Sequence, residues 1–196
     1  SGSMTIILRT YYGNTQIGSD QYYYYTVNVP SSVVPTLSQV TCSEYMSDVH
    51  NLIGAYVQNK SRLSLAIIGA SGSYGSVITT YKISVAGQTI NAVSGTTGIM
   101  TTSGNQTITA TITDSRGRTA TKSISVNVLP YIHPKINGVG VERNTDTSAL
   151  VTANLLSTSL IVNGIEKNFS RYLIEYKSVD ASSYTQIEAS AESLSY

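Results

Sequence analysis

The chain has 196 residues, a length that accommodates one or two domains. Only 12% of its residues are charged and the formal net charge is +1, which argues against nucleic acid or a cationic protein as a partner. The single cysteine, Cys42, excludes an intrachain disulfide, and no segment reaches the roughly 20 apolar residues of a membrane-spanning helix. The abundance of Thr, Val, Ile and Tyr favours an all-β fold.

Residues 1–30 are predicted to form a β-hairpin. The run IILRTYYGNTQIGSDQYYYYTVNV contains two strand-like stretches around a Gly-Asn and Gly-Ser-Asp connection. A lone hairpin is only marginally stable in water, so we expect this one to be the closing hairpin of a preceding, truncated sandwich. The prolines at 30 and 35 then predict an extended linker.

Residues 34–130 have the length of one β-sandwich domain. Apolar residues alternate with polar ones around Val40 and Cys42, over 63–67 and over 77–85, and shorter strands are expected at 89–93 and near Ile99. Residues 51–59 are ambiguous and fit either a loop or a short turn of helix. Seven strands separated by turn signals predict an Ig-like β-sandwich of antiparallel sheets with Greek-key connections.

The strongest pattern in the chain is TITATITDSRGRTATKSISVNV, residues 107–128, which predicts the last hairpin of this sandwich. Ile108, Ala110 and Ile112 fall on one face of its first strand. The second strand has its own apolar face, formed by Ala120, Ile124, Val126 and Val128. Asp114 to Arg118 supply the turn, in which Gly117 is free to adopt a positive φ.

Residues 131–196 are expected to hold the first strands of a second, incomplete sandwich of fibronectin-type-III-like type. Strands are predicted over 149–161, 171–177 and 184–187, too few to close a sandwich. Because unpaired sheet edges recruit strands, residues 4–30 are a candidate to complete this part, within one molecule or by strand exchange between copies. The alternative is a truncated part with a frayed end.

Catalytic, cofactor and metal sites are not expected. The two histidines, His50 and His133, have no nucleophile placed beside them, and no G-x-S-x-G elbow is present. Two dispersed histidines and one cysteine do not form a zinc site of usual spacing. Cys42 is interpreted as a buried thiol, and the glycine-rich stretch 69–75 as a flexible loop, because it lacks the strand-to-helix context of a phosphate-binding loop. The sequence therefore predicts a protein that is not an enzyme.

Two groups of residues are candidates for surface contacts. The run Tyr22, Tyr23, Tyr24 and Tyr25 would place alternate rings on opposite faces of a strand, where exposed rings suit contact with carbohydrate or protein. The alternative is that these rings pack across the hairpin against Tyr11 and Tyr12. Arg116 and Arg118, on the tip of the 107–128 hairpin, are candidates to bind an anionic cell-wall polymer.

Four stretches together resemble a recurring module in tail proteins of siphophages that infect Gram-positive bacteria: VPSSVVPTLSQVT, NKSRLSLAIIGASGSYGSVITTYKISVAGQTI, ITATITDSRGRTATKSISVNVLPYIHPKI and RYLIEYKSVDASSYTQI. Proteins of this group are described as minor structural or tail-associated proteins. The likeness covers most of residues 28–190 and supplies no catalytic residues.

This resemblance implies a component of the phage virion, near the tail tip or on a fibre, whose sandwiches act as spacers or adhesive modules in host attachment. Its implied partners are other phage tail proteins and host cell-wall polysaccharide. The alternative function is a carbohydrate-binding or adhesin module of a bacterial surface protein. It differs from the first in that isolated protein would bind sugar through a groove lined with tyrosine.

Overall fold

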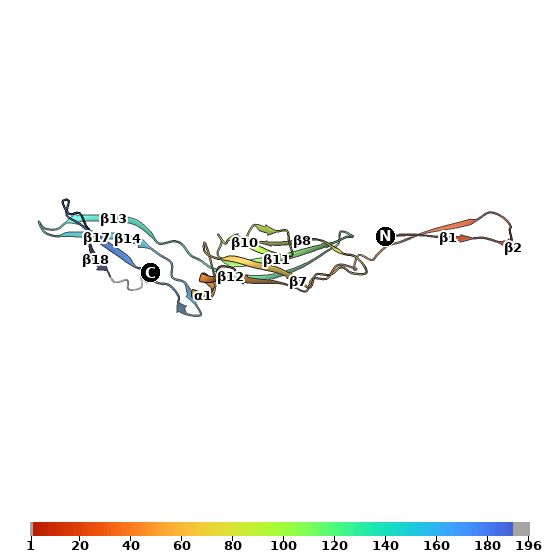
Figure 1. Ribbon diagram of the computed structural model, residues 1–196, viewed down its shortest axis with the longest axis horizontal. Helices are drawn as coiled ribbons and strands as arrows, with labels where there is room; N and C mark the ends of the chain where they lie inside the picture. The colour runs from red at the N-terminus through yellow and green to blue at the C-terminus, as the bar shows by residue number, and fades with distance from the viewer. Residues whose placement is uncertain (1, 190–196) are drawn as a thin grey trace.

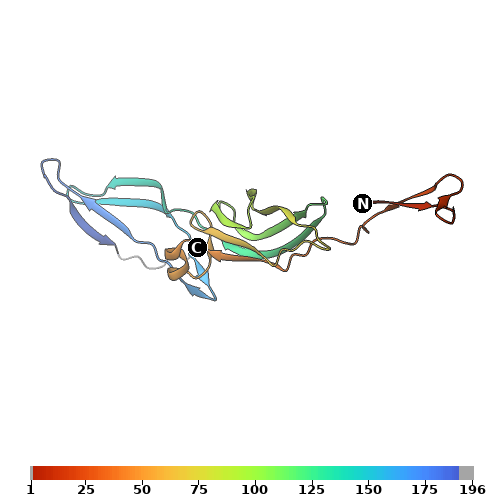
Figure 2. The same cartoon turned by 45° about the vertical axis from the view of Figure 1, so that its right-hand side comes forward.

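The computed structural model describes residues 2–189. Within that range every regular element is a strand except one short helix, α1 (Ser47–Leu52), which confirms the all-β prediction. The molecule is elongated: an N-terminal hairpin, a central sandwich and a C-terminal group of small sheets follow one another along its long axis (Figure 1). The same order is seen after rotation (Figure 2). No helix of the described residues is long and apolar enough to cross a membrane.

The N-terminal hairpin consists of β1 (Gly2–Leu8) and β4 (Gln21–Val27), which pair antiparallel with Met4 opposite Tyr25 and Ile7 opposite Tyr22. The connection between them folds into a smaller hairpin of β2 (Tyr11–Tyr12) and β3 (Thr15–Gln16). Among residues 2–189, β1 and β4 pair with no other strand. All side chains of both strands are exposed, so this hairpin has no core of its own.

The central sandwich is formed by two facing sheets. The first has the strand order β10-β7-β5 and the second the order β6-β12-β11-β8-β9. The strands of the first sheet are β5 (Gln39–Glu44), β7 (Arg62–Ile68) and β10 (Ser94–Ile99). Those of the second are β6 (Tyr56–Val57), β8 (Ile78–Val85), β9 (Gln88–Ile90), β11 (Gly104–Asp114) and β12 (Thr119–Leu129). All pairings are antiparallel except the short one between β6 and β12.

The core of this sandwich follows the predicted alternation. Ile108, Ala110 and Ile112 of β11 are fully buried, and they face alternate residues of the opposite sheet in one cluster. The other fully or almost fully buried members from the strands are Val40, Leu63, Leu65, Ile67, Ile83, Val85 and Val128. Val77 differs from the prediction, because it precedes β8 and is exposed. Each buried aliphatic side chain contributes about 1.5–3 kcal/mol, so this cluster is the main source of stability.

The outward face of β11 and β12 carries hydroxyl groups in place of charges. Thr109 lies opposite Ser123 with 3.1 Å between their hydroxyl oxygens, and Thr111 lies opposite Thr121 at 3.3 Å. Cross-strand hydroxyl pairs of this kind add to sheet stability. The long hairpin is therefore tied together on its solvent side as well as on its core side.

The C-terminal part consists of three separate two-stranded ladders. β13 (Lys135–Arg143) pairs with β14 (Ala149–Leu156), and β17 (Tyr172–Tyr176) pairs with β18 (Thr185–Ala189). A small hairpin of β15 (Ile161–Val162) and β16 (Ile165–Glu166) lies between them in the chain. The expected strand over 149–161 is thus interrupted after β14. β13 was not predicted, because its glycines weaken the strand pattern.

The hairpin of residues 4–30 does not complete the C-terminal part within one molecule. The two lie at opposite ends of the long axis, with the central sandwich between them (Figures 1 and 2). The reason is the linker that follows β4, which is bound to the end of the central sandwich remote from β13. Completion of the C-terminal part by the hairpin of a second copy stays a prediction.

Candidate functional site

The linker between the N-terminal hairpin and the central sandwich is held by one arginine. The guanidinium of Arg118 donates one hydrogen bond to the carbonyl oxygen of Val33 and another, of 2.6 Å, to that of Val29. The hydroxyl of Ser73 adds a bond of 2.6 Å to the carbonyl of Val34. Hydrogen bonds from a charged donor are among the stronger ones in proteins, so the linker is fixed to the sandwich at several points. We call these contacts the N-terminal junction.

Arg118 is positioned by the turn that joins β11 to β12. One carboxylate oxygen of Asp114 accepts the backbone N–H groups of Arg116 and Arg118, both at 2.9 Å, while Gly117 adopts a φ of +75°. Asp114 is only 2% exposed. Burial opposes its ionisation, but the backbone amide of Arg118, Ser76 and the backbone amide of Arg116 together hold the pKa of Asp114 below its usual range. The turn therefore presents a fixed carboxylate inward and its arginines outward.

Arg116 also serves the fold. Its guanidinium donates hydrogen bonds of 2.8 and 2.6 Å to the carbonyl oxygens of Ser73 and Tyr74 in the neighbouring loop. In the same loop, a Cβ added to Gly72 would lie 1.9 Å from the carbonyl oxygen of Ser76, so glycine is required there for close packing. The sequence offered Arg116 and Arg118 only as candidates for contact with an anionic polymer, which stays a prediction. It did not predict these intramolecular partners, which lie far away in the chain.

A second junction joins the central sandwich to the C-terminal part through a small apolar cluster. Val49 of α1, Val57 of β6 and Leu160 are buried together, and Leu160 is 5% exposed although it belongs to the C-terminal part. The partly buried side chains of Met46, Ile53, Leu129 and Tyr131 surround them. The ambiguous stretch 51–59 thus contains the end of a helix and a strand, both of which serve this C-terminal junction.

Polar contacts around Tyr131 complete the C-terminal junction. The side-chain amide of Asn59 donates to the carbonyl oxygen of Tyr131 at 3.0 Å, and the backbone N–H of Tyr131 donates to the Gln58 side chain at 3.2 Å. The Lys60 ammonium lies 5.6 Å from the centre of the Tyr131 ring, within the range of a cation–π contact. The His133 ring meets the same tyrosine edge to face, at 5.5 Å between centres. His133 therefore has a packing role at this junction.

The four tyrosines of β4 are divided between the two faces of the N-terminal hairpin. Tyr23 lies opposite Ile6 and Tyr25 opposite Met4, so one face is apolar. Tyr22 and Tyr24 point to the other face, as the period of a strand requires. The alternative, cross-strand packing against Tyr11 and Tyr12, is wrong, because the four tyrosines of β4 pair with residues 4–7 of β1. Tyr11 and Tyr12 pair instead with Gln16 and Thr15.

The Tyr22 face of the hairpin is ordered by polar contacts. The rings of Tyr22 and Tyr24 are nearly parallel, 8° apart, with 6.2 Å between centres. The Tyr22 hydroxyl donates to Asp20 at 3.2 Å, and Arg9 forms an ion pair with the same carboxylate at 2.9 Å. Hydrogen bonds from Arg9 and then Gln16 lower the pKa of Asp20 to about 2. The two rings are thus stacked side by side on an exposed face, with hydroxyl tips.

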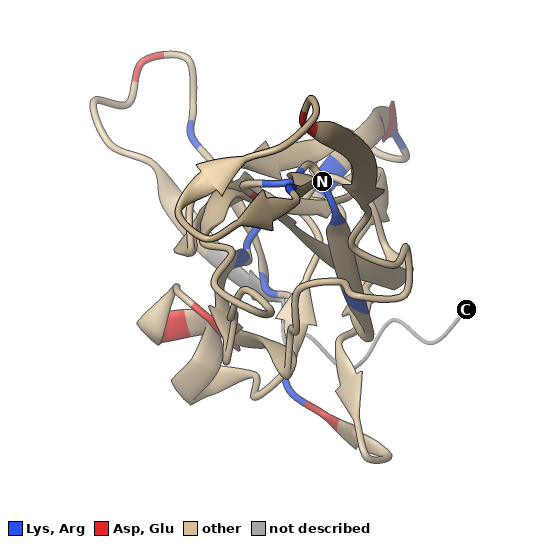
Figure 3. Cartoon of the chain, turned by 90° about the vertical axis from the view of Figure 1, so that its right-hand side faces the viewer, with Lys and Arg blue, Asp and Glu red and all other residues tan. Residues whose placement is uncertain are grey.

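An open groove of about 1430 Å³ lies between the β13–β14 and β17–β18 sheets. Apolar side chains from both sheets line it, including Val139, Val141, Val151, Tyr172 and Ile174. Val139 and Val141 are 62% and 69% exposed, unusual values for valines that face another sheet. Figure 3, which views the chain along its long axis from the N-terminal end, shows the acidic and basic residues distributed over several elements. The groove is therefore an apolar surface that no other element among residues 2–189 covers.

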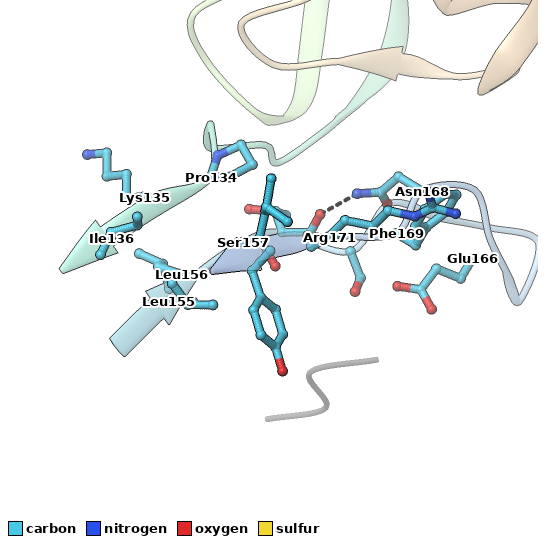
Figure 4. A pocket seen from close by; sticks show the side chains of 15 residues that line it. Pro134, Lys135, Ile136, Leu155, Leu156, Ser157, Glu166, Asn168, Phe169 and Arg171 are labelled. Atoms are coloured by element: carbon cyan, nitrogen blue, oxygen red, sulfur yellow. Dashed lines mark hydrogen bonds between the residues drawn. The ribbon is translucent and has the colours of Figure 1, made fainter. Parts of the chain in front are cut away.

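A smaller pocket of about 400 Å³ lies near Pro134. Figure 4 shows Ile136 and Leu156 on one side of it, and Phe169 and Arg171 on the other. The amide of Asn168 donates to the carbonyl oxygen of Thr158 at 2.8 Å and thereby closes the β15–β16 hairpin. The pocket combines apolar walls with a few polar groups, and it adjoins the C-terminal junction.

The other candidate groups lie apart from one another. Cys42 is half-buried against the core, and burial raises the pKa of its thiol, which lowers the fraction present as reactive thiolate. His50 is exposed in the last turn of α1. Among residues 2–189, no group of three or more His, Cys, Asp or Glu side chains is placed to hold a metal ion.

One family model, described as "Siphovirus protein of unknown function (DUF859)", matches residues 1–195. The match therefore extends over the N-terminal hairpin, the central sandwich and the C-terminal sheets. No curated protein matches the chain.

Proposed function

The chain belongs to the DUF859 family of siphovirus proteins, and we propose that it is a structural component of the phage particle that acts as a rigid spacer in host attachment. The observation that supports this role is the construction of the two junctions. A flexible string of domains would have exposed linkers with few contacts. Here both linkers are bound to the central sandwich, by Arg118 at one end and by the cluster around Leu160 at the other.

We also propose that the central sandwich is Ig-like with Greek-key connections, and that the C-terminal part is of fibronectin-type-III-like type. The order β10-β7-β5 facing β12-β11-β8 corresponds to the strand order expected of such a sandwich. Sandwiches of this kind occur with many functions, so the assignment supports a spacer without identifying a receptor. In this proposal the protein has no catalytic activity and acts through its shape and surfaces alone.

Location in the virion, and in its tail specifically, is tested on purified phage. Antibodies raised against residues 34–130 should label intact particles in electron micrographs, at the tail. Mass spectrometry of the same particles should detect the protein in fixed proportion to the other tail proteins, its proposed partners. A protein that is made during infection but is missing from washed particles would contradict the proposal.

Adhesion to host cell-wall polysaccharide is a second candidate function, favoured by the exposed pair of parallel rings at Tyr22 and Tyr24. Aromatic faces with hydroxyl tips combine an apolar contact surface with hydrogen bonding. The test compares binding to purified host cell wall by the unchanged protein and by Tyr22→Ser with Tyr24→Ser. Tyr74→Ser is the control, because Tyr74 lies in a loop of the central sandwich and is even more exposed than Tyr22 and Tyr24. Binding that survives loss of both rings, or that is absent from the unchanged protein, would exclude this surface.

A further inference from the structure

The N-terminal hairpin can be superposed on the hairpin that closes the central sandwich so that apolar residues take matching positions. In β1–β4, Met4 lies opposite Tyr25 and Leu8 opposite Gln21. In β11–β12, Ile108 lies opposite Ile124 and Ile112 opposite Ala120, with the same spacing along each strand. When β1–β4 is superposed on β11–β12 in this register, the apolar face of β1–β4 takes the position of the core-facing side of β11–β12. The residues of that face are Met4, Ile6, Leu8, Tyr23, Tyr25 and Val27.

The segments that follow the two hairpins agree as well. Val27-Asn28-Val29 is followed by Pro35, and Val126-Asn127-Val128 is followed at identical spacing by Pro134. Both turns also contain a glycine with positive φ, Gly18 at +82° and Gly117 at +75°. The two hairpins therefore share a Val-Asn-Val end and the spacing to a following proline, although the connection of β1 to β4 contains the additional β2–β3 hairpin.

The C-terminal sheet repeats the strands that this unit covers in the central sandwich. Val40 lies opposite Ile67 and Cys42 opposite Leu65 in β5–β7. In β13–β14, Val139 lies opposite Ala153 and Val141 opposite Val151. The first set packs in the core, whereas Val139, Val141 and Val151 are exposed in the groove.

The strand on the other side of the groove corresponds to β8. Tyr81, Ile83 and Val85 of β8 alternate in the same order as Tyr172, Ile174 and Tyr176 of β17. In the central sandwich β8 pairs with β11, so that Ala110 lies opposite Ile83 and Ile112 opposite Tyr81. The edge of β17 that corresponds to this pairing has no strand beside it among residues 2–189.

We propose that the β1–β4 hairpin of one copy fills the groove of a second copy of this chain. There β1 pairs with the open edge of β17, and the apolar face of the hairpin covers β13–β14, as β11–β12 covers β5–β7. If β1 pairs with β17 in the register that β11 has with β8, then Ile6 lies opposite Ile174, Leu8 opposite Tyr172 and Thr5 opposite Glu175. The Tyr22 and Tyr24 face remains outside.

Hairpin and groove lie at opposite ends of the molecule, so this contact is heterologous and joins copies head to tail (Figure 1). Each added copy leaves one free hairpin and one free groove. Association therefore continues into linear chains rather than stopping at a symmetric dimer. Head-to-tail association and the proposed spacer role are independent of each other, so either can hold without the other.

The first experiment measures association by analytical ultracentrifugation of the full chain. The unchanged protein should form a concentration-dependent series of oligomers. Ile6→Asp, on the hairpin face, and Val141→Asp, in the groove, should each raise the dissociation constant more than about tenfold, because each buries a charge. Ile7→Asp is the matched control, since Ile7 lies on the opposite face of the same strand, and it should associate like the unchanged protein.

A mixture of the two variants separates this contact from unspecific apolar aggregation. The Val141→Asp copy keeps an intact hairpin and the Ile6→Asp copy keeps an intact groove. Mixed, they should form a one-to-one dimer that grows no further. A monomeric unchanged protein at every concentration, equal association of all three variants, or no dimer in the mixture would each overturn the proposal.

The register is tested by a disulfide between copies. In a Cys42→Ser background, Thr5→Cys on one copy and Glu175→Cys on another should form a cross-linked dimer under mild oxidation. Thr5→Cys with Ile174→Cys is the control, because Ile174 points to the other face of β17. Equal cross-linking of both pairs, or of neither pair, would contradict the register.

Discussion

Ile112 lies at the centre of the apolar cluster and is fully buried between the two sheets. Ile112→Asp should destabilise the central sandwich by more than about 4 kcal/mol, because a charge would be placed where no partner is available. Thermal unfolding followed by circular dichroism measures the effect. Thr107→Asp is the matched control on the exposed face of the same strand and should change the melting temperature little. Similar losses in both variants would contradict the assignment of faces.

The thiol of Cys42 should react slowly in the folded protein. Burial raises its pKa and restricts access, and both effects reduce attack by the thiolate. Alkylation with iodoacetamide, followed by mass spectrometry, should be much slower in buffer than in denaturant. In Cys42→Ser with Ser43→Cys, the new thiol lies on the exposed face of β5 and should react at nearly the rate of free cysteine. Fast alkylation of folded Cys42 would show that β5 is not packed as described.

Asp20 should remain ionised to unusually low pH. Its folded pKa of about 2 lies below the ordinary value of 3.8, so its contribution to the order of the hairpin loop is complete above about 3.8. That contribution is lost as the pH falls through 2. An NMR titration of the carboxyl carbon measures the pKa directly. Arg9→Gln should move the pKa back towards 3.8, since Arg9 is the main cause of the shift.

The linker over residues 29–36 depends on the turn between β11 and β12. Arg118→Ala removes the two hydrogen bonds to Val29 and Val33, so amide hydrogen exchange of the linker should become about tenfold faster for each ~1.4 kcal/mol lost. Exchange within β7 and β11 should not change. Arg143→Ala is the control, because Arg143 also donates to two backbone carbonyl oxygens, those of Thr145 and Asp146, but lies in the C-terminal part away from the linker. Unchanged linker exchange in Arg118→Ala would show that this tether contributes little.

The elements that sequence alone predicted are those with one buried and one solvated face. Alternation marks β7, β11, the second half of β8 and most of β12, because there burial decides every second residue. β13 was not predicted, because Gly138 and Gly140 interrupt the alternation of apolar and polar residues. Its valines are also exposed, so burial imposes no pattern on this strand. The helix α1 has six residues, too few for a helical period to be recognised.

The candidate contact surfaces were predicted less completely than the strands. Alternation of the four tyrosines of β4 follows from the strand period alone, and the structure has it. Their partners across the hairpin depend on the register, which the unforeseen β2–β3 hairpin sets. The partners of Arg118 and Leu160 come from distant parts of the chain, and no local pattern identifies them. The repeated Val-Asn-Val motif with its following proline was the one signal in the sequence that the two hairpins are alike.

At the scale of the whole molecule, the orientation of the C-terminal part depends on Leu160. Leu160→Asn places a polar amide in the cluster with Val49 and Val57, and the C-terminal junction should loosen. Small-angle X-ray scattering, at dilutions where the protein is monomeric, should then show a broader distribution of lengths, while the melting temperature of the central sandwich stays the same. Ile161→Asn is the matched control, because Ile161 is exposed. Identical scattering from the unchanged protein and Leu160→Asn would mean that other contacts fix the orientation.

The hydroxyl pairs along the outer face of β11 and β12 are neutral, and in the described part of the chain Arg9 and Asp20 form the only ion pair. Dissolved ions weaken attractions between exposed charges and leave neutral hydrogen bonds and buried apolar contacts largely unaffected. A molecule assembled in this way keeps nearly the same cohesion at low and at high salt concentration. Such tolerance suits an object that leaves one cell and must reach another through a medium it does not control.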